Sequence, residues 1–436
     1  MKKVELLAPA KNIKAINAGI DYADSFYFGA KDFNMRMQAD NFTDRELARA
    51  VKMCHDRGKK VYFTSNILVY ENELNLLYQA LANAYEIGFD AAIVNDIAAI
   101  EYAKDIGIPI HVSTQQNISN STAAKFFEKL GAERLILARE CSLEQIAEIK
   151  SKLTTAGIEV FIHGAMCTSI SGRCYFSMDV CGDNEHSANR GRCVQPCRRE
   201  WRVFDEKNNE YIYDGVRFMN SRDLCMIEYI PELIEANIDA FKIEGRMRSP
   251  HYVEIVTKIY HEAIESYYKN KFTKDQKKMV GKWIYELKKV YNRGFTNGFY
   301  LKRATQEDQQ HVSPTNLSHW RLIELGQVLT YSKTENKAKV LLRNGRLKEG
   351  MRILLQGGTR SDTYFHQTIK LIEYKNHRVK STRKASYNSP VVVWINAEEQ
   401  MQSKKRDKLY IFTNKTYRHR KKRSDKKLRK KDYYKL

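Results

Sequence analysis

The sequence has no apolar run close to the ~18 residues that a membrane-spanning helix needs, so it predicts no transmembrane segment. It also lacks the pattern of a secretory signal. The start, Met1 to Lys3, is basic, but Pro9 and Lys11 interrupt the apolar stretch that would have to follow. We therefore expect neither a leader nor a membrane anchor.

Cysteine is scarce. Eight cysteines in 436 residues are too few for a disulfide scaffold, and their clustering favours a reducing compartment, so we expect a cytoplasmic protein. Five of them lie between Glu159 and Trp201, in polar, Arg-rich sequence where a thiol gains little from burial. This placement indicates metal ligation or chemistry. The five are Cys167, Cys174, Cys181, Cys193 and Cys197.

Acidic residues are also in short supply. The chain has 74 Lys and Arg against 52 Asp and Glu, a net charge of +22, which favours a polyanionic partner such as RNA. The excess is concentrated at the end, where residues 415–436 hold twelve Lys or Arg and two Asp. We expect residues 414–436 to form a basic, disordered tail that contacts phosphates without reading sequence.

The cysteine spacing excludes several familiar motifs. Cys167, Cys174, Cys193 and Cys197 follow the pattern C-x6-C-x18-C-x3-C, unlike the compact runs of bacterial ferredoxins or the close pairs of zinc ribbons. The radical S-adenosylmethionine motif is absent because Glu200 stands where its third cysteine would be. Spacing alone favours an iron–sulfur cluster but leaves structural zinc and unligated thiols or disulfides open.

Apolar runs alternate with helical patterns over the first two thirds of the chain. Thr43 to Glu46 and Ser142 to Gln145 read as capping boxes that start helices. Alternating strands and helices predict a parallel sheet, and eight units predict a closed (β/α)8 barrel, with an open doubly wound sheet as the alternative. The eight strands are expected to begin at Val4, Ser25, Val61, Ala91, Ile108, Arg134, Glu159 and Ala240.

The gap between the last two strands is far longer than a loop and one helix. We expect a cysteine-bearing insertion over 167–239, with a short hairpin near 201–216, standing over the carboxyl ends of the strands, where barrel enzymes place their active sites. The barrel with its insertion is expected to span 1–310. A small antiparallel β-barrel should follow over 311–413, built from β-rich runs. These runs are 322–330, 339–342, 351–355, 364–372, 391–395 and 409–412.

The segment Glu159-x-Phe-x-x-Gly164-Ala-Met-Cys167, followed by Ser171-Gly-Arg-Cys174, resembles the signature of the U32 peptidase family, also called collagenase-like proteases. Within that family the chain is most similar to the members that hydroxylate a wobble uridine of tRNA with prephenate. Further matching motifs are Glu5 to Ala10, Asn34-x-Arg36, Ser113 to Gln115, Leu137 to Glu140, Ser221 to Leu224, Lys242 to Arg246 and Asn292 to Phe295.

The resemblance implies tRNA hydroxylation at the wobble uridine, with a [4Fe-4S] cluster held by Cys167, Cys174, Cys193 and Cys197. It also implies a prephenate-like dicarboxylate co-substrate and, for the C-terminal part, a likeness to the β-barrel of translation elongation factors. Cys181 is left out of the ligand set. Cys54, Cys141 and Cys225 fall on barrel elements and are expected in the core.

Polar residues at the expected strand ends are the other candidates. Glu140, His163, Glu244 and Arg246 are expected to be catalytic. Gln115, Arg173, Arg198 and Arg199 are expected to bind substrate, because arginine can hold phosphate or carboxylate groups with two hydrogen bonds. The arginines near the cysteines are equally suited to offset thiolate charge. Asp96 is expected to cap a helix and Asn66 to form a turn.

Two other functions remain open. A cysteine peptidase would use Cys167 with His163 as its base and Glu159 to orient the ring. A zinc protease is excluded because His261-Glu262 has no second histidine at the required spacing. The second is an RNA-binding protein whose metal site only holds the fold.

Overall fold

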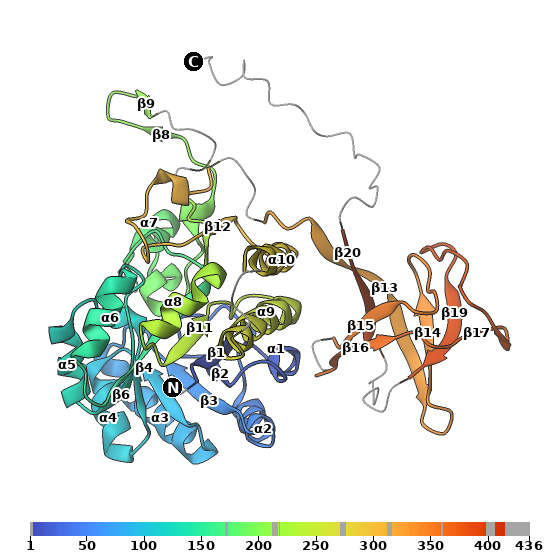
Figure 1. Cartoon of the computed structure of the whole chain (residues 1–436), viewed down its shortest axis with the longest axis horizontal. Coiled ribbons are helices and arrows are strands. Elements are labelled where there is room, and N and C mark those ends of the chain that lie inside the picture. The colour runs from blue at the N-terminus through green and yellow to red at the C-terminus, as the bar shows by residue number, and fades with distance from the viewer. Residues whose placement is uncertain are drawn as a thin grey trace.

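The computed structural model describes residues 3–170, 173–211, 217, 219–270, 276–311, 316–358, 361–397 and 406–414. Its larger part is a closed barrel of eight parallel strands, in which the last strand pairs with both the first and the seventh (Figure 1). Closure excludes the open doubly wound sheet and confirms the (β/α)8 prediction. The strands are β1 (Glu5–Pro9), β2 (Ser25–Phe28), β3 (Lys60–Ser65), β4 (Ala91–Val94), β5 (Ile110–Val112), β6 (Ala132–Ile136), β7 (Gly157–Ala165) and β11 (Ala240–Ile243).

Helices follow the strands and cover the outside of the barrel. Thr43 and Ser142 each start a helix with the reciprocal contacts of a capping box, and the Asp96 carboxylate accepts a hydrogen bond from the Ala98 N–H. These helix starts agree with the sequence. The helices are α1 (Ile13–Gly19), α2 (Asp44–His55), α3 (Leu74–Ile87), α4 (Ile97–Ile106), α5 (Ser121–Lys129), α6 (Leu143–Ser151), α8 (Ile230–Glu235), α9 (Pro250–Tyr268) and α10 (Gln276–Lys288).

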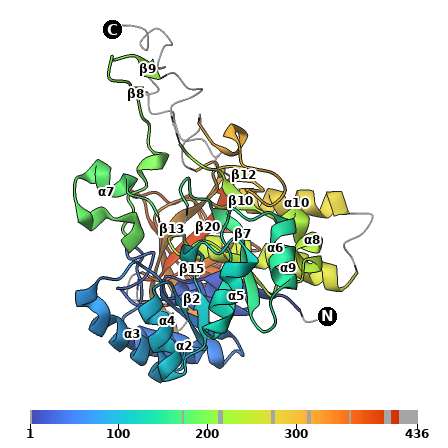
Figure 2. The same ribbon diagram turned by 90° about the vertical axis from the view of Figure 1, so that its left-hand side faces the viewer.

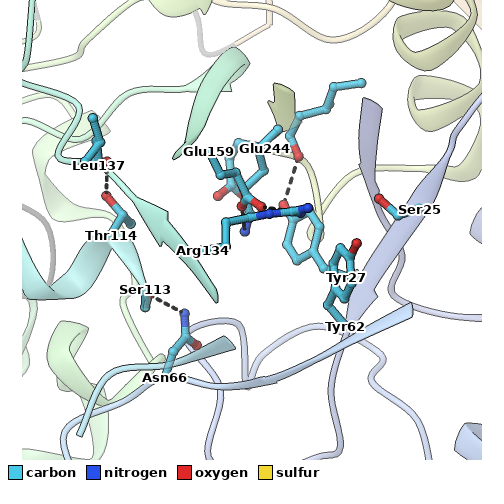
Figure 3. A network of polar contacts seen from close by, with 12 residues as sticks. Ser25, Tyr27, Tyr62, Asn66, Ser113, Thr114, Arg134, Leu137, Glu159 and Glu244 are labelled. Atoms are coloured by element: carbon cyan, nitrogen blue, oxygen red, sulfur yellow. Dashed lines mark hydrogen bonds and ion pairs between the residues drawn. The ribbon is translucent and has the colours of Figure 1, made fainter. Parts of the chain in front are cut away.

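Paired charges fill part of the barrel interior (Figure 3). The Arg134 guanidinium donates to Glu5 Oε2 at 2.7 Å and to Glu159 Oε2 at 3.3 Å, and Lys242 Nζ donates to Glu159 Oε1 at 2.7 Å. Tyr62 donates its hydroxyl proton to Glu5. Each of these four charges, on Glu5, Arg134, Glu159 and Lys242, therefore has an opposite charge in contact, which limits the free-energy cost of taking it out of water.

The segment between β7 and β11 forms the expected insertion at one end of the barrel (Figure 2). It contains α7 (Phe176–Cys181) and a hairpin of β8 (Val203–Phe204) and β9 (Glu210–Tyr211). Its strand β10 (Asp223–Cys225) then pairs antiparallel with the end of β7 and parallel with β12 (Phe295–Thr296). The insertion is thus joined to the barrel by hydrogen bonds between β10 and β7, the strand that precedes Cys167.

A separate eight-stranded antiparallel sheet follows and encloses its own apolar core. The six β-rich runs of the sequence all lie on its strands, but the run over 364–372 divides into two strands, and the hairpin partner of the second was not expected. The strands are β13 (Trp320–Ser332), β14 (Lys337–Leu342), β15 (Arg352–Gln356), β16 (Tyr364–Thr368), β17 (Ile372–Tyr374), β18 (His377–Arg378), β19 (Val391–Asn396) and β20 (Lys408–Asn414).

The sheet packs beside the barrel, against α1 and α9 (Figure 1). Lys14 of α1 donates to the Gly358 carbonyl at 2.7 Å, and Asn17 donates to the Asp362 carbonyl at 2.8 Å. Residues 415–436, which include most of the expected basic tail, lie outside the described residues. Within the described part of the chain, no helix has both the length and the apolar character that crossing a membrane requires.

Candidate functional site

A cavity of about 190 Å³ lies at the carboxyl ends of the barrel strands, beneath the insertion. Its walls come from the last residues of the strands and from the loops that follow them, including Asn66 after β3, Gln115 after β5 and Glu244 after β11. This is the end of the barrel where (β/α)8 enzymes hold their reacting groups. Four of the five clustered cysteines line the same cavity, namely Cys167, Cys174, Cys193 and Cys197.

The four cysteines approach the cavity from different parts of the insertion. Cys167 follows β7 and is exposed, whereas the other three are half-buried. Burial raises the pKa of both the Cys193 and the Cys197 thiols, and each also responds to the charges of Cys167 and Cys174, so all four lie within electrostatic range. Cys181 is exposed and lies outside the cavity lining, and Cys54, Cys141 and Cys225 are buried as expected.

The insertion backbone is fitted closely to the barrel. Gly164 has φ of +107°, and a Cβ atom there would lie 2.3 Å from the Glu244 carbonyl oxygen. Gly191 has φ of +75°, and a Cβ atom there would lie 2.3 Å from the Asn34 carbonyl oxygen. Only glycine suits these positions, because other residues are strained at a positive φ and carry a Cβ atom that would clash with the carbonyl. These two contacts set the approach of the cysteine-bearing segments.

Buried polar groups hold the cysteine loops in place. The Arg198 guanidinium is 8% exposed and donates to the carbonyls of Met166, at 2.5 Å, and Ser221, at 3.0 Å. Burial lowers the pKa of Arg198. The Asn189 side chain accepts from the Cys174 N–H at 3.0 Å. Arg198 therefore lines the cavity, but the guanidinium itself is engaged with the backbone beside Cys167.

A carboxylate and two arginines form the opposite wall. Glu244 Oε2 lies 3.1 Å from the Arg36 guanidinium and 3.6 Å from that of Arg139. Burial acts to raise the pKa of Glu244, but the neighbouring cations, Arg36 first, hold it below its usual value. Glu244 also raises the pKa of Arg36, which lies close enough to Cys167 to sense its charge. Arg139 also stacks over the Phe161 ring, 4.1 Å from its centroid.

Arg246 has a different setting. It is 3% exposed, and its guanidinium donates to Asn34 at 3.0 Å, to Thr64 at 2.9 Å and to Asn41. Burial lowers the pKa of Arg246 to about 10. Arg246 thus reaches the cavity wall while it joins the loop after β2 to the end of β3.

The remaining sequence candidates divide into two groups. Gln115 and Arg173 line the cavity, in agreement with a role in substrate binding. Arg199 is exposed and Glu140 half-buried, and both lie outside the lining. In the described chain, Glu140 Oε2 is buried without a hydrogen-bond partner. Strict alternation from Arg134 would turn Glu140 inward, but β6 ends at Ile136 and the turn presents Arg139 instead.

His163 is placed differently from the expectation. The pairing of β7 with β11 shifts between Phe161 and His163, so that Ile162 is an extra residue and the side chains after it change face. The His163 ring consequently lies 5.4 Å from the Tyr260 ring of α9 and is 1% exposed. Burial lowers its pKa to about 4. It does not line the cavity, and Glu159, engaged by Arg134 and Lys242, cannot orient it.

Three charged residues of the cavity lining were absent from the sequence candidates: Arg36, Arg139 and Lys242. All three stand inside motifs that carry the family resemblance, namely Asn34-x-Arg36, Leu137 to Glu140 and Lys242 to Arg246. Arg139 and Lys242 also lie near the ends of β6 and β11, whereas for Arg36 the motif was the available signal. With them the lining holds six cationic side chains and one carboxylate, a setting suited to anions.

Comparison with known proteins places this site in a family. The model of peptidase family U32 matches residues 10–310. An uncharacterized protease of Methanocaldococcus jannaschii is 41% identical over 368 residues, covering 82% of this chain and 88% of the relative. A collagenase of Porphyromonas gingivalis is 33% identical over 94% of this chain and 97% of the relative. A tRNA hydroxylation protein of Bacillus subtilis is 35% identical over 79% and 81%. The chain belongs to peptidase family U32.

Proposed function

We propose that the chain is an RNA-hydroxylating enzyme that acts on a wobble uridine of tRNA and holds an iron–sulfur cluster of the [4Fe-4S] type on Cys167, Cys174, Cys193 and Cys197. The convergence of these four cysteines on an arginine-lined cavity at the carboxyl end of the barrel carries the proposal. The tRNA hydroxylation name of the Bacillus relative supports the reaction class. The net charge of +22 suits a nucleic-acid substrate.

The four thiols are placed to share one group. Cys167, Cys174, Cys193 and Cys197 line one cavity, and Cys193 and Cys197 each respond to the charges of Cys167 and Cys174. Their C-x6-C-x18-C-x3-C spacing differs from the close pairs of zinc ribbons, which favours a cluster. The Gln195 N–H points at Cys193 Sγ from 3.3 Å, the kind of contact that tunes cluster potentials.

The cationic wall suits a small dicarboxylate such as a prephenate-like co-substrate. Arg36 and Arg139 both face Glu244 and both line the cavity, so a carboxylate that enters meets two guanidinium groups. Arg173, beside Cys174, lines the same cavity and is exposed, which suits the second carboxylate. Paired arginines bind carboxylates in fixed orientation through parallel charge-assisted hydrogen bonds.

In the proposed mechanism, Arg36 and Arg139 orient the co-substrate, and Glu244 keeps both guanidinium groups in place between turnovers. A bound cluster would supply electron transfer or an iron that binds a substrate atom. Arg198 keeps Met166, and hence Cys167, against the barrel. An uridine base would have to leave its stack to reach this recess, as bases do in other enzymes that modify them.

The first test measures the metal content of the protein and the hydroxylated uridine in tRNA. Protein purified without oxygen should contain iron and labile sulfide and absorb broadly in the blue. Replacing Cys167, Cys174, Cys193 or Cys197 by Ser should remove the cluster and abolish hydroxylated uridine in tRNA, measured by mass spectrometry of nucleosides. Cys181→Ser is the matched control, since this exposed thiol lies outside the cavity lining. Stoichiometric zinc without sulfide in the wild type would overturn the cluster.

The second test concerns the co-substrate. Arg36→Lys keeps the charge but loses the paired donors, so we expect the KM for the dicarboxylate to rise about tenfold or more, with the iron content unchanged. Arg57→Lys is the control, because Arg57 is exposed on the barrel's outside and its ion pair is with Asp21. An unchanged KM in Arg36→Lys would remove this residue from the binding site.

The rival function is peptide hydrolysis, which the names of two relatives favour. A cysteine peptidase needs a base beside its thiol. Here His163, the expected base, lies in the layer between β7 and α9 with its pKa lowered to about 4. We therefore expect no thiol-dependent cleavage of unfolded protein. Cleavage that is lost in both Cys167→Ser and His163→Ala would reverse this ranking.

A further inference from the structure

A second cluster of metal-ligating side chains lies away from the cysteines, between the barrel and the antiparallel sheet. Two members come from the first turns of α9, which begins at Pro250 after the N-cap Ser249. His251 and Glu254 are three residues apart, so both point to the same side of the helix. They are 5% and 8% exposed, and a carboxylate is rarely buried so deeply without strong partners.

The partners come from β16 of the sheet. Tyr364 and His366 are two residues apart and therefore share one face of the strand. The Tyr364 hydroxyl donates to Glu254 Oε2 at 2.5 Å, and His366 Nε2 lies 2.9 Å from the same carboxylate. On the helix, His251 Nδ1 lies 3.3 Å from Glu254 Oε2. Two side chains of α9, His251 and Glu254, thus face two side chains of β16, Tyr364 and His366.

The separations are those of ligands around one ion. One donor atom each of His251, Glu254 and His366 lies within 4.8 Å of the other two. Nitrogen and oxygen ligands at about 2.0–2.1 Å from tetrahedral zinc stand about 3.3 Å apart, close to the contacts that Glu254 makes. The nitrogen of His251 that faces Glu254 and Tyr364 is Nδ1, so this atom would be the ligand.

We propose that His251, Glu254 and His366 bind a divalent transition-metal ion, with zinc as the best match. Imidazole ligands exclude calcium and magnesium, which prefer oxygen. The Tyr364 hydroxyl stands within 3.4 Å of His251 Nδ1, in reach of the fourth position. The burial of the helix ligands suits a closed, structural ion.

The site would join two parts of the molecule. Glu254 and His366 are 112 residues apart, and Tyr364 also belongs to the small apolar cluster with Ala18 and Leu354 at the contact of barrel and sheet. The His251 ring stacks edge-on against Phe412 of β20, with centroids 4.3 Å apart. An ion held from both sides would cross-link barrel and sheet and stabilise only the docked arrangement.

The test compares full-length wild type with His366→Ala and Glu254→Gln after chelator treatment and addition of zinc. The wild type should bind one more equivalent of zinc than either variant, with only nitrogen and oxygen around that ion in X-ray absorption spectra. Zinc should raise the Tm of the wild type more than that of the variants. His377→Ala is the matched control, since His377 is an exposed histidine on β18.

The spectrum separates this site from the cysteines, because zinc on thiolates shows sulfur at about 2.3 Å. Iron(II) retained with nitrogen and oxygen ligands and lost in His366→Ala would support the site with a different ion, as two histidines and one carboxylate also bind iron. Zinc, cobalt and iron that bind equally to wild type and variants, with an unshifted wild-type Tm, would overturn the proposal. The group would then be hydrogen-bonded only, around the Glu254 carboxylate.

Discussion

Single side chains in this barrel show how strongly burial changes their properties. Glu159 is fully buried, yet it remains in contact with both Arg134 and Lys242, so its charge is compensated. Among the described residues, no carboxylate contacts His163 of the same strand, whose ring lies among those of Tyr260 and Phe295. Glu159 is therefore ion-paired in the interior, whereas burial favours the neutral form of His163.

The stability of the protein should therefore depend on His163 in acid. Its pKa is lowered to about 4 by burial, against about 6.5 in an unfolded chain. Between these values the unfolded state binds a proton that the folded state does not, so stability falls as the pH drops from about 6.5 to about 4. The loss from this residue is about 3 kcal/mol.

His163→Phe keeps an aromatic ring but cannot titrate. We expect its free energy of unfolding, measured with urea at several pH values, to decline less steeply than that of the wild type between pH ~6.5 and pH ~4. His377→Phe, at an exposed position of β18, should follow the wild type. Identical slopes for His163→Phe and the wild type would show that the folded protein accepts the proton at no cost.

At the scale of elements, β7 determines the site. Its extra residue at Ile162 sends His163 outward, and Gly164 then lets the strand pass the Glu244 carbonyl closely enough to deliver Cys167 to the cavity. One irregular strand thus separates the aromatic layer from the cysteine cavity. The bulge depends on pairing with β11, which begins 81 residues after Glu159 in the chain.

Gly164→Ala should disturb both the fold and the site. The new Cβ would lie 2.3 Å from the Glu244 oxygen at a φ of +107°, so we expect a loss of about 2–4 kcal/mol in unfolding free energy and a lower iron content. Gly107→Ala is the control: its φ is +79° with no atom within 4 Å of the Cβ, so backbone strain alone should cost about 1–2 kcal/mol. Equal losses in both variants would contradict the close approach.

At the scale of the whole molecule, charge is distributed unevenly. Residues 415–436 account for +10 of the net +22, although the cavity with its cationic wall lies in the barrel. We expect the tail to add affinity for any tRNA through phosphate contacts, and the barrel to supply discrimination.

Truncation after Asn414 should weaken binding to matched and unmatched tRNAs alike. Each lost phosphate contact flattens the dependence of log affinity on log salt by on the order of 0.7–0.9. The measurement is binding to both kinds of tRNA over a salt series, with and without the tail. An unchanged slope would make the tail a solvated appendage, and a loss of discrimination would mean that it reads bases.

The chain's local patterns were sufficient for the barrel strands and for several helix starts. Buried strands are recognisable in the sequence as short apolar runs. The helix starts at Thr43, Asp96 and Ser142 depend on contacts between groups within three residues of one another. The clustering of cysteines within one insertion is likewise a local property, so the motif and the family resemblance were both visible in the sequence. Eight alternating units favoured a barrel, but they left an open doubly wound sheet as the alternative, because the number of strands does not decide closure.

Only the tertiary structure decided which side chains meet. The closure of β1 on β11, the shifted register that turns His163 outward and the early end of β6 that presents Arg139 rather than Glu140 depend on pairing between distant strands. The contact of His251 and Glu254 with His366 requires the docking of two separate cores. Alternation along a strand is local, but a bulge or a domain contact is set by packing, which the order of residues does not display.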